Sequence, residues 1–171
     1  MGAGRPNSSC VGRLATETHR NAEPHHLRIS DNAMSYKTLE HATDAIIEVT
    51  ADNLNDAFKT AGISVIETTL DISKVEEKEN KKIVVEGKDL KYLLYNWLEE
   101  IIILTITEGF AGKRIQVEMN EDDKWRITAE IFGESIDLKK HEFKVEIKSP
   151  TFHDMRIEQN EKIVMRYLLD L

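Results

Sequence analysis

The chain has 171 residues, of which 40 % are hydrophobic and 32 % are charged, and its formal net charge is −8. This length and composition suit one globular domain with a single core. The acidic excess argues against direct binding to nucleic-acid phosphates, because cationic side chains supply that affinity. No apolar run approaches the roughly 20 residues of a membrane-spanning helix. We therefore expect a soluble cytoplasmic protein with no nucleic-acid or membrane partner.

The first 33 residues differ in composition from the remainder. They hold the only cysteine, three of the six histidines and no lysine, whereas 15 lysines follow from Met34 onward. They also lack apolar periodicity, so we interpret residues 1–33 as a vector-derived leader or a disordered tail and residues 34–171 as the folded domain. Because that domain has no cysteine, disulfides, zinc thiolate sites and cysteine nucleophiles are excluded from it.

In chain order, two short strands over residues 36–39 and 45–50 come first. A helix follows over residues 53–70, where apolar residues fall on one face at helical spacing: Leu54, Ala57, Phe58, Ala61 and Val65. The mixed-charge stretch 74–82 is typical of a solvated connector. A second helix is predicted over residues 88–104, with a stronger apolar stripe formed by Leu90, Leu93, Leu94, Trp97, Leu98 and Ile101.

The remaining segments alternate at period two or are rich in β-branched residues, which predicts strands at 82–86, 114–120, 125–132, 144–148, 152–158 and 163–169. A polar turn at residues 120–123 separates two of these strands, and Gly133 is predicted to end the second of them. The order of elements favours an α+β fold in one domain, with two helices packed on one face of a mixed, largely antiparallel β-sheet.

No nucleophile elbow, phosphate-binding loop or dinucleotide fingerprint is present, so any site chemistry must come from carboxylates and histidines. Asp44 opens the second strand, Asp56 lies in the first turn of the first helix, and Asp170 follows the last strand. Each has an ordinary interpretation, as a turn residue, a helix-capping residue and a solvated chain end.

Taken together, these three acids can converge at one edge of a sheet, where like charges repel unless a cation balances them. Oxygen-rich ligands select hard divalent ions, so a Ca²⁺, Mn²⁺ or Mg²⁺ site is the functional interpretation. The C-terminal carboxylate of Leu171 is a fourth candidate ligand.

Four further polar residues are candidates for a supporting role: His41, His141, Lys148 and His153. His41 precedes Asp44 closely, and the other three lie in the later predicted strands or beside them. Their ordinary interpretations are loop histidines, a half-exposed strand histidine and a solvated lysine. The spacing of these residues does not decide between the two interpretations.

Several motifs resemble those of the archease family over residues 36–171. LEHATD carries His41 and Asp44 in the places of the family's His-Thr-Ala-Asp motif, with the two middle residues exchanged. GKDLKYLLYNWL, residues 87–98, matches the family's helix signature, and KHEFKVEIKSPTFHDM, residues 140–155, is similar to a later family run. LLDL at the end resembles the family's apolar-Asp-Ile ending, and Asp56 stands where archeases carry a glutamate.

This resemblance implies an accessory protein and not an enzyme. Archeases assist the RtcB-type RNA ligase of tRNA splicing by promoting its guanylylation and its repeated turnover, and they bind a divalent metal through the acids that Asp44, Asp56 and Asp170 match. Two other interpretations stay open on the residues alone. One is a self-sufficient metal-dependent phosphoester hydrolase that activates water, and the other is a calcium-dependent chaperone or binding module. The oligomeric state is left open.

Overall fold

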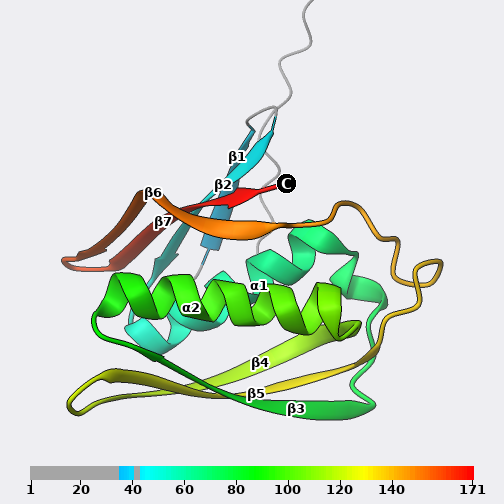
Figure 1. The fold of residues 1–171 in the computed structure, drawn as a ribbon, viewed down its shortest axis with the longest axis horizontal. Helices are drawn as coiled ribbons and strands as arrows, with labels where there is room; N and C mark the ends of the chain where they lie inside the picture. Colours follow the sequence, from blue (N-terminus) through cyan, green and yellow to red (C-terminus); the bar gives the residue numbers. More distant parts are fainter. Residues whose placement is uncertain (1–34, 41–42) are drawn as a thin grey trace, which may run out of the picture.

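The computed structural model of the protein describes residues 35–40 and 43–171. The chain forms three layers, with two helices enclosed between a four-stranded and a three-stranded sheet (Figure 1). The leader predicted over residues 1–33 and the candidate His41 both lie outside the described residues. In the described part, neither helix has the length and apolar character needed to cross a membrane.

The elements follow one another in the order ββαβαββββ. Their bounds are β1 Ser35–Glu40, β2 Asp44–Ala51, α1 Leu54–Thr69, β3 Glu79–Gly87, α2 Leu90–Ile102, β4 Phe110–Glu121, β5 Trp125–Ser135, β6 Ser149–Gln159 and β7 Ile163–Asp170. A short 3₁₀ turn, Ile72–Lys74, follows α1, and a π-helical turn, Ile103–Thr107, extends α2. Both predicted helices are confirmed to within two residues at their N-termini.

The strands pair as β1-β2-β7-β6 in one sheet and β3-β5-β4 in the other, and every pair in the described part of the chain is antiparallel. The α+β class, the two helices and the single domain are therefore confirmed. The single mixed sheet is corrected to two antiparallel sheets with the helices between them. The reason is visible in α1, where every residue from Thr60 to Ile66 is buried. A helix buried on all sides needs cover from more than one sheet.

Both helices begin at a residue whose side chain caps the first turn. The Asn53 side chain accepts a hydrogen bond from the Asp56 amide at 2.9 Å, and the Asp89 side chain accepts one from the Tyr92 amide at 2.9 Å. The helices are joined in the core, where the indole N–H of Trp97 donates to the carbonyl of Phe58 at 2.8 Å. This buried hydrogen bond fixes α2 against the middle of α1.

Two predictions about strands are wrong. Residues 144–148 form no ladder, because their amides reach isolated carbonyls: Lys144 N–H donates to Thr69 and Lys148 N–H donates to Asp170, each at 2.8 Å. Gly133 does not end a strand, because it lies inside β5. A Cβ atom at Gly133 would come within 1.8 Å of the Ala111 carbonyl oxygen, so glycine there allows β4 and β5 to approach closely.

Candidate functional site

Asp44 and Asp170 lie directly opposite each other in the antiparallel pair of β2 and β7. Their neighbours Ala45 and Leu169 are buried against the helices, and successive side chains of a strand alternate between faces. The two aspartates therefore project from the outer face of the four-stranded sheet. Residues opposed in this way have Cβ atoms about 4.5–5.5 Å apart, so this part of the predicted convergence is present in the structure.

Neighbouring main-chain and side-chain groups join this pair at the same corner of the sheet. The Lys148 amide donates to the Asp170 carbonyl at 2.8 Å, and its ammonium donates to the main-chain oxygen of Leu171 at 2.5 Å. The Leu171 amide donates to the Thr43 carbonyl at 3.3 Å, and the Thr43 hydroxyl donates to Asp44 Oδ2 at 3.3 Å. The candidate Lys148 therefore lies beside the aspartate pair, and so does Thr43, which the sequence did not single out.

The corner combines two half-buried carboxylates with one exposed ammonium group. Facing carboxylates repel one another and favour a bound cation. Across residues 35–40 and 43–171, no three His, Cys, Asp or Glu side chains form a metal-binding group. The described side chains therefore offer two carboxylates in this position, and the predicted three-acid cluster is not assembled.

Asp56 is the acid that the structure places elsewhere. It lies at the start of α1, beyond the far end of β2, where Ala51 pairs with Ile163. At about 3.3 Å per residue, β2 carries the chain roughly 23 Å away from Asp44 before the helix begins. The Asp56 side chain accepts a hydrogen bond from Asn53 Nδ2 at 2.7 Å, so its ordinary interpretation as a capping residue is the one that the geometry supports.

His141 is a buried part of a polar cluster at the three-stranded sheet. Its Nδ1 accepts the Asp137 amide at 3.0 Å, and its Nε2 lies 3.1 Å from Glu134 Oε1. Lys140 and Lys78 also bind Glu134, at 2.5 and 2.6 Å. Their hydrogen bonds, that of Lys140 above all, hold the pKa of Glu134 well below its usual range. His141 therefore has a structural position, apart from the aspartate pair.

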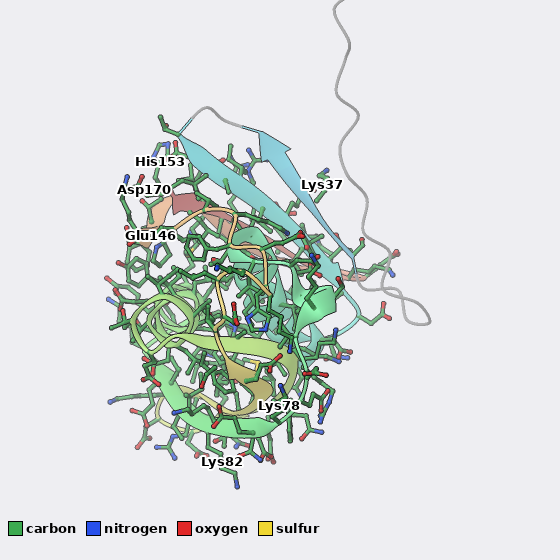
Figure 2. All side chains as sticks on the ribbon, turned by 90° about the vertical axis from the view of Figure 1, so that its right-hand side faces the viewer. Lys37, Lys78, Lys82, Glu146, His153 and Asp170 are labelled. Carbon is green, nitrogen blue, oxygen red and sulfur yellow. The ribbon has the colours of Figure 1, made fainter. Side chains whose placement is uncertain are left out.

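His153 is exposed in the irregular part of β6, where the register with β7 shifts between Thr151 and Arg156. Its amide donates to the Thr151 hydroxyl at 3.1 Å. Ser149, the partner of Asp170 on β6, precedes it by four residues, or roughly 13 Å of extended chain. Figure 2 shows His153 and Asp170 on the same side of the molecule and Lys78 near its opposite end.

Residues 36–171 match the model of the Archease protein family (MTH1598/TM1083). The chain belongs to the archease family. Among its relatives, the protein archease of Pyrococcus abyssi is 38 % identical over 121 residues, which cover 70 % of this chain and 85 % of that protein. The protein archease of Pyrobaculum calidifontis is 34 % identical over 140 residues, which cover 80 % and 95 %.

A solved archease-like fold supports the same assignment. The solution structure of protein 1598 from Methanobacterium thermoautotrophicum superimposes with a TM-score of 0.69 at 28 % identity, over 80 % of this chain and 98 % of that one. The archease match begins at Tyr36 and includes both aspartates of the pair, Lys148 and both helices. The sequence resemblance to archeases is therefore confirmed.

Proposed function

We propose that this archease is a non-catalytic accessory protein of an RtcB-type RNA ligase in cytoplasmic tRNA splicing, and that it promotes guanylylation and multiple turnover of the ligase. The observation that supports this function is the opposed pair Asp44 and Asp170, with Lys148 beside it, at an exposed corner of the sheet. Such a corner is open to a large partner. The acidic excess of the chain complements a basic protein surface.

The donor set fits a hard divalent ion. Asp44 and Asp170 would supply carboxylate oxygens and Leu171 a main-chain oxygen, which are the ligand types that Ca²⁺, Mn²⁺ and Mg²⁺ prefer. When bound, the ion would neutralise negative charge at the nucleotide site of the ligase. Two carboxylates leave coordination positions for the partner or for water. Lys148 holds the Leu171 oxygen in place and presents a positive charge at the rim of the site.

The test is ligase guanylylation in the presence of the purified chain and its Asp44→Ala and Asp170→Ala variants. We expect each variant to lower the stimulation by about tenfold or more, because half of the carboxylate pair is lost. Asp123→Ala, an exposed aspartate in the turn between β4 and β5, is the matched control and should stimulate like the wild type. Wild-type stimulation by both pair variants would remove the pair from the function.

The same preparations separate this function from that of an independent hydrolase. RNA and simple phosphoesters are incubated with the chain and Mn²⁺ without ligase. Hydrolysis that is lost in Asp44→Ala would favour the hydrolase, whereas stimulation seen only with ligase supports the accessory role. Protection of unrelated proteins from aggregation in Ca²⁺ would favour the chaperone interpretation.

A further inference from the structure

Residues 136–148 link β5 of the three-stranded sheet to β6 of the four-stranded sheet and belong to neither ladder. Main-chain hydrogen bonds hold this segment at three points. They run from the Asp71 amide to the His141 carbonyl, from the Lys144 amide to the Thr69 carbonyl, and from the Lys148 amide to the Asp170 carbonyl, each at 2.8 Å. The first two points lie at the C-terminal end of α1 and the third lies at the aspartate pair. The segment therefore connects the end of α1 to the candidate site.

Lys144 binds the C-terminal end of α1 through two groups. Its amide donates to the Thr69 carbonyl at 2.8 Å, and its ammonium donates to the Glu67 carbonyl at 2.9 Å. The last carbonyls of a helix have no partner within the helix, and the last turn of α1 holds no basic residue of its own. A cation at this end of a helix also interacts favourably with the helix dipole. Lys144, which follows Glu67 by 77 residues, therefore supplies donors and a charge that α1 lacks locally.

The four residues after Lys144 continue as an extended chain towards the aspartate pair. Ile147 is 1 % exposed and Val145 is half-buried, whereas Lys144, Glu146 and Lys148 are exposed. Because successive side chains of an extended chain alternate in direction, the buried Ile147 fixes the side towards which Lys148 faces. About 13 Å of extended chain separates Lys144 from Lys148. An extended chain cannot lengthen further, so the attachment of Lys144 to α1 limits where Lys148 can lie.

Lys148 transmits this constraint to the aspartate pair. Its amide donates to the Asp170 carbonyl at 2.8 Å, and its ammonium donates to the main-chain oxygen of Leu171 at 2.5 Å. The Leu171 amide donates in turn to the Thr43 carbonyl at 3.3 Å. Figure 2 shows Glu146, two residues before Lys148, on the same side of the molecule as Asp170. A displacement of Lys148 would therefore move both the positive charge beside the pair and the Leu171 oxygen.

We propose that Lys144 is a positioning residue for the aspartate pair. Its own hydrogen bonds are to the end of α1, and it acts on the pair through Lys148. When the ammonium of Lys144 is removed, the segment keeps the amide bond to Thr69 but loses the bond to Glu67, so Lys148 leaves Asp170 and Leu171 more often. This inference rests on the proposed function only for what the site does, because the attachment of the segment is a property of the chain alone.

The first experiment measures amide hydrogen exchange in the chain without ion or ligase. Lys144→Met keeps the apolar stem of the side chain and removes the ammonium. We expect the amides of Lys148 and Leu171 to exchange about tenfold faster, because the segment opens more often, while amides in the middle of α2 keep their wild-type rates. Lys144→Arg should restore wild-type exchange, since a guanidinium can also donate to the Glu67 carbonyl. Wild-type exchange of both amides in Lys144→Met would overturn the inference and leave the proposed function standing.

Lys113→Met is the matched control. The ammonium of Lys113, on β4 of the other sheet, also donates to a main-chain carbonyl, that of Ile72 at 2.8 Å. The control should therefore lose the same kind of hydrogen bond without changing exchange at Lys148 or Leu171. Equally accelerated exchange of these two amides in both lysine variants would indicate a general loss of stability, and the inference would be overturned.

The second experiment measures ligase guanylylation in the presence of the same variants. We expect Lys144→Met to lower the maximal stimulation by about threefold, less than the loss of a direct partner of a metal ligand, and Lys144→Arg to stimulate like the wild type. Wild-type stimulation by Lys144→Met, despite faster exchange at Lys148, would reduce Lys144 to a structural role and overturn the inference. If the wild-type chain itself does not stimulate the ligase, the proposed function fails, and the inference falls with it whatever the exchange rates are.

Discussion

Asp44 and Asp170, which stand near opposite ends of the folded domain in sequence, occupy directly opposed positions on β2 and β7. Their side chains share the outer face of the sheet, because Ala45 and Leu169 beside them are buried against the helices. Two like charges in this geometry destabilise a sheet by a few tenths to about 1 kcal/mol. A cation bound between the two carboxylates would remove their repulsion.

We expect Asp170→Asn to change thermal stability with opposite signs in two conditions. In chelator its melting temperature should equal or exceed that of the wild type, because a repulsive contact is removed. With Ca²⁺ or Mn²⁺ the wild type should gain stability, by about 2.7 kcal/mol when the ion is present at 100 times its dissociation constant, and Asp170→Asn should not. Calorimetry with and without ion measures both effects. Asp123→Asn is the control, and an equal ion response in Asp170→Asn would contradict the proposed site.

Asp56→Ala should lower the stability of α1 and leave the Asp44–Asp170 pair unchanged. The variant loses the hydrogen bond from Asn53 Nδ2 and a favourable charge at the N-terminus of α1. The loss of the charge should lower the free energy of unfolding by about 0.3–1 kcal/mol. Asn53→Ala, which removes the cap itself, should cost about 1 kcal/mol. Chemical denaturation measures these costs. Both variants should keep the wild-type ion response and ligase stimulation, and loss of either in Asp56→Ala would return Asp56 to the metal site.

The Glu134 cluster should make stability fall in acid. Lys140 and Lys78 hold the pKa of Glu134 below its unfolded value of about 4.3, so the unfolded chain binds more protons in acid. The contribution of Glu134 is therefore complete from about one pH unit above that unfolded value, and it is lost progressively as the pH falls further. We expect Glu134→Gln to be less stable than the wild type at pH 7 and to show a shallower loss between pH 5 and 2. Glu99→Gln, an exposed position on α2, should follow the wild-type profile.

Gly133→Ala should be among the most damaging small substitutions. The added Cβ would meet the Ala111 carbonyl oxygen at 1.8 Å, and both groups belong to paired strands that must separate to admit it. We expect a loss of at least about 3 kcal/mol of unfolding free energy, or failure to fold. Gly109→Ala is the comparison, since nothing lies within 4 Å of its Cβ and only its φ of 65° opposes alanine, at about 1 kcal/mol. Similar stability of the two variants in denaturant would contradict the close approach.

The helices were predicted well because helical periodicity and capping depend on residues that are close together in the sequence. The apolar period marked both helices, and Asn53 and Asp89 cap them as their side-chain chemistry suggests. The extended segment 144–148 has the composition of a strand, but its Lys144 and Lys148 amides donate to Thr69 and Asp170 and it joins no ladder. Ladder formation depends on a partner, which local propensity does not specify.

The sequence by itself determined the two helices, most of the strands, the acidic character and, through its motifs, the archease resemblance. Only the tertiary structure decided which polar residues meet: it opposed Asp44 to Asp170, placed Lys148 beside them, carried Asp56 to the far end of β2 and buried His141 against Glu134. The physical reason is that helix caps and periodicity are set by neighbours along the chain, whereas the register of β2 against β7 depends on the packing of their buried faces on the helices.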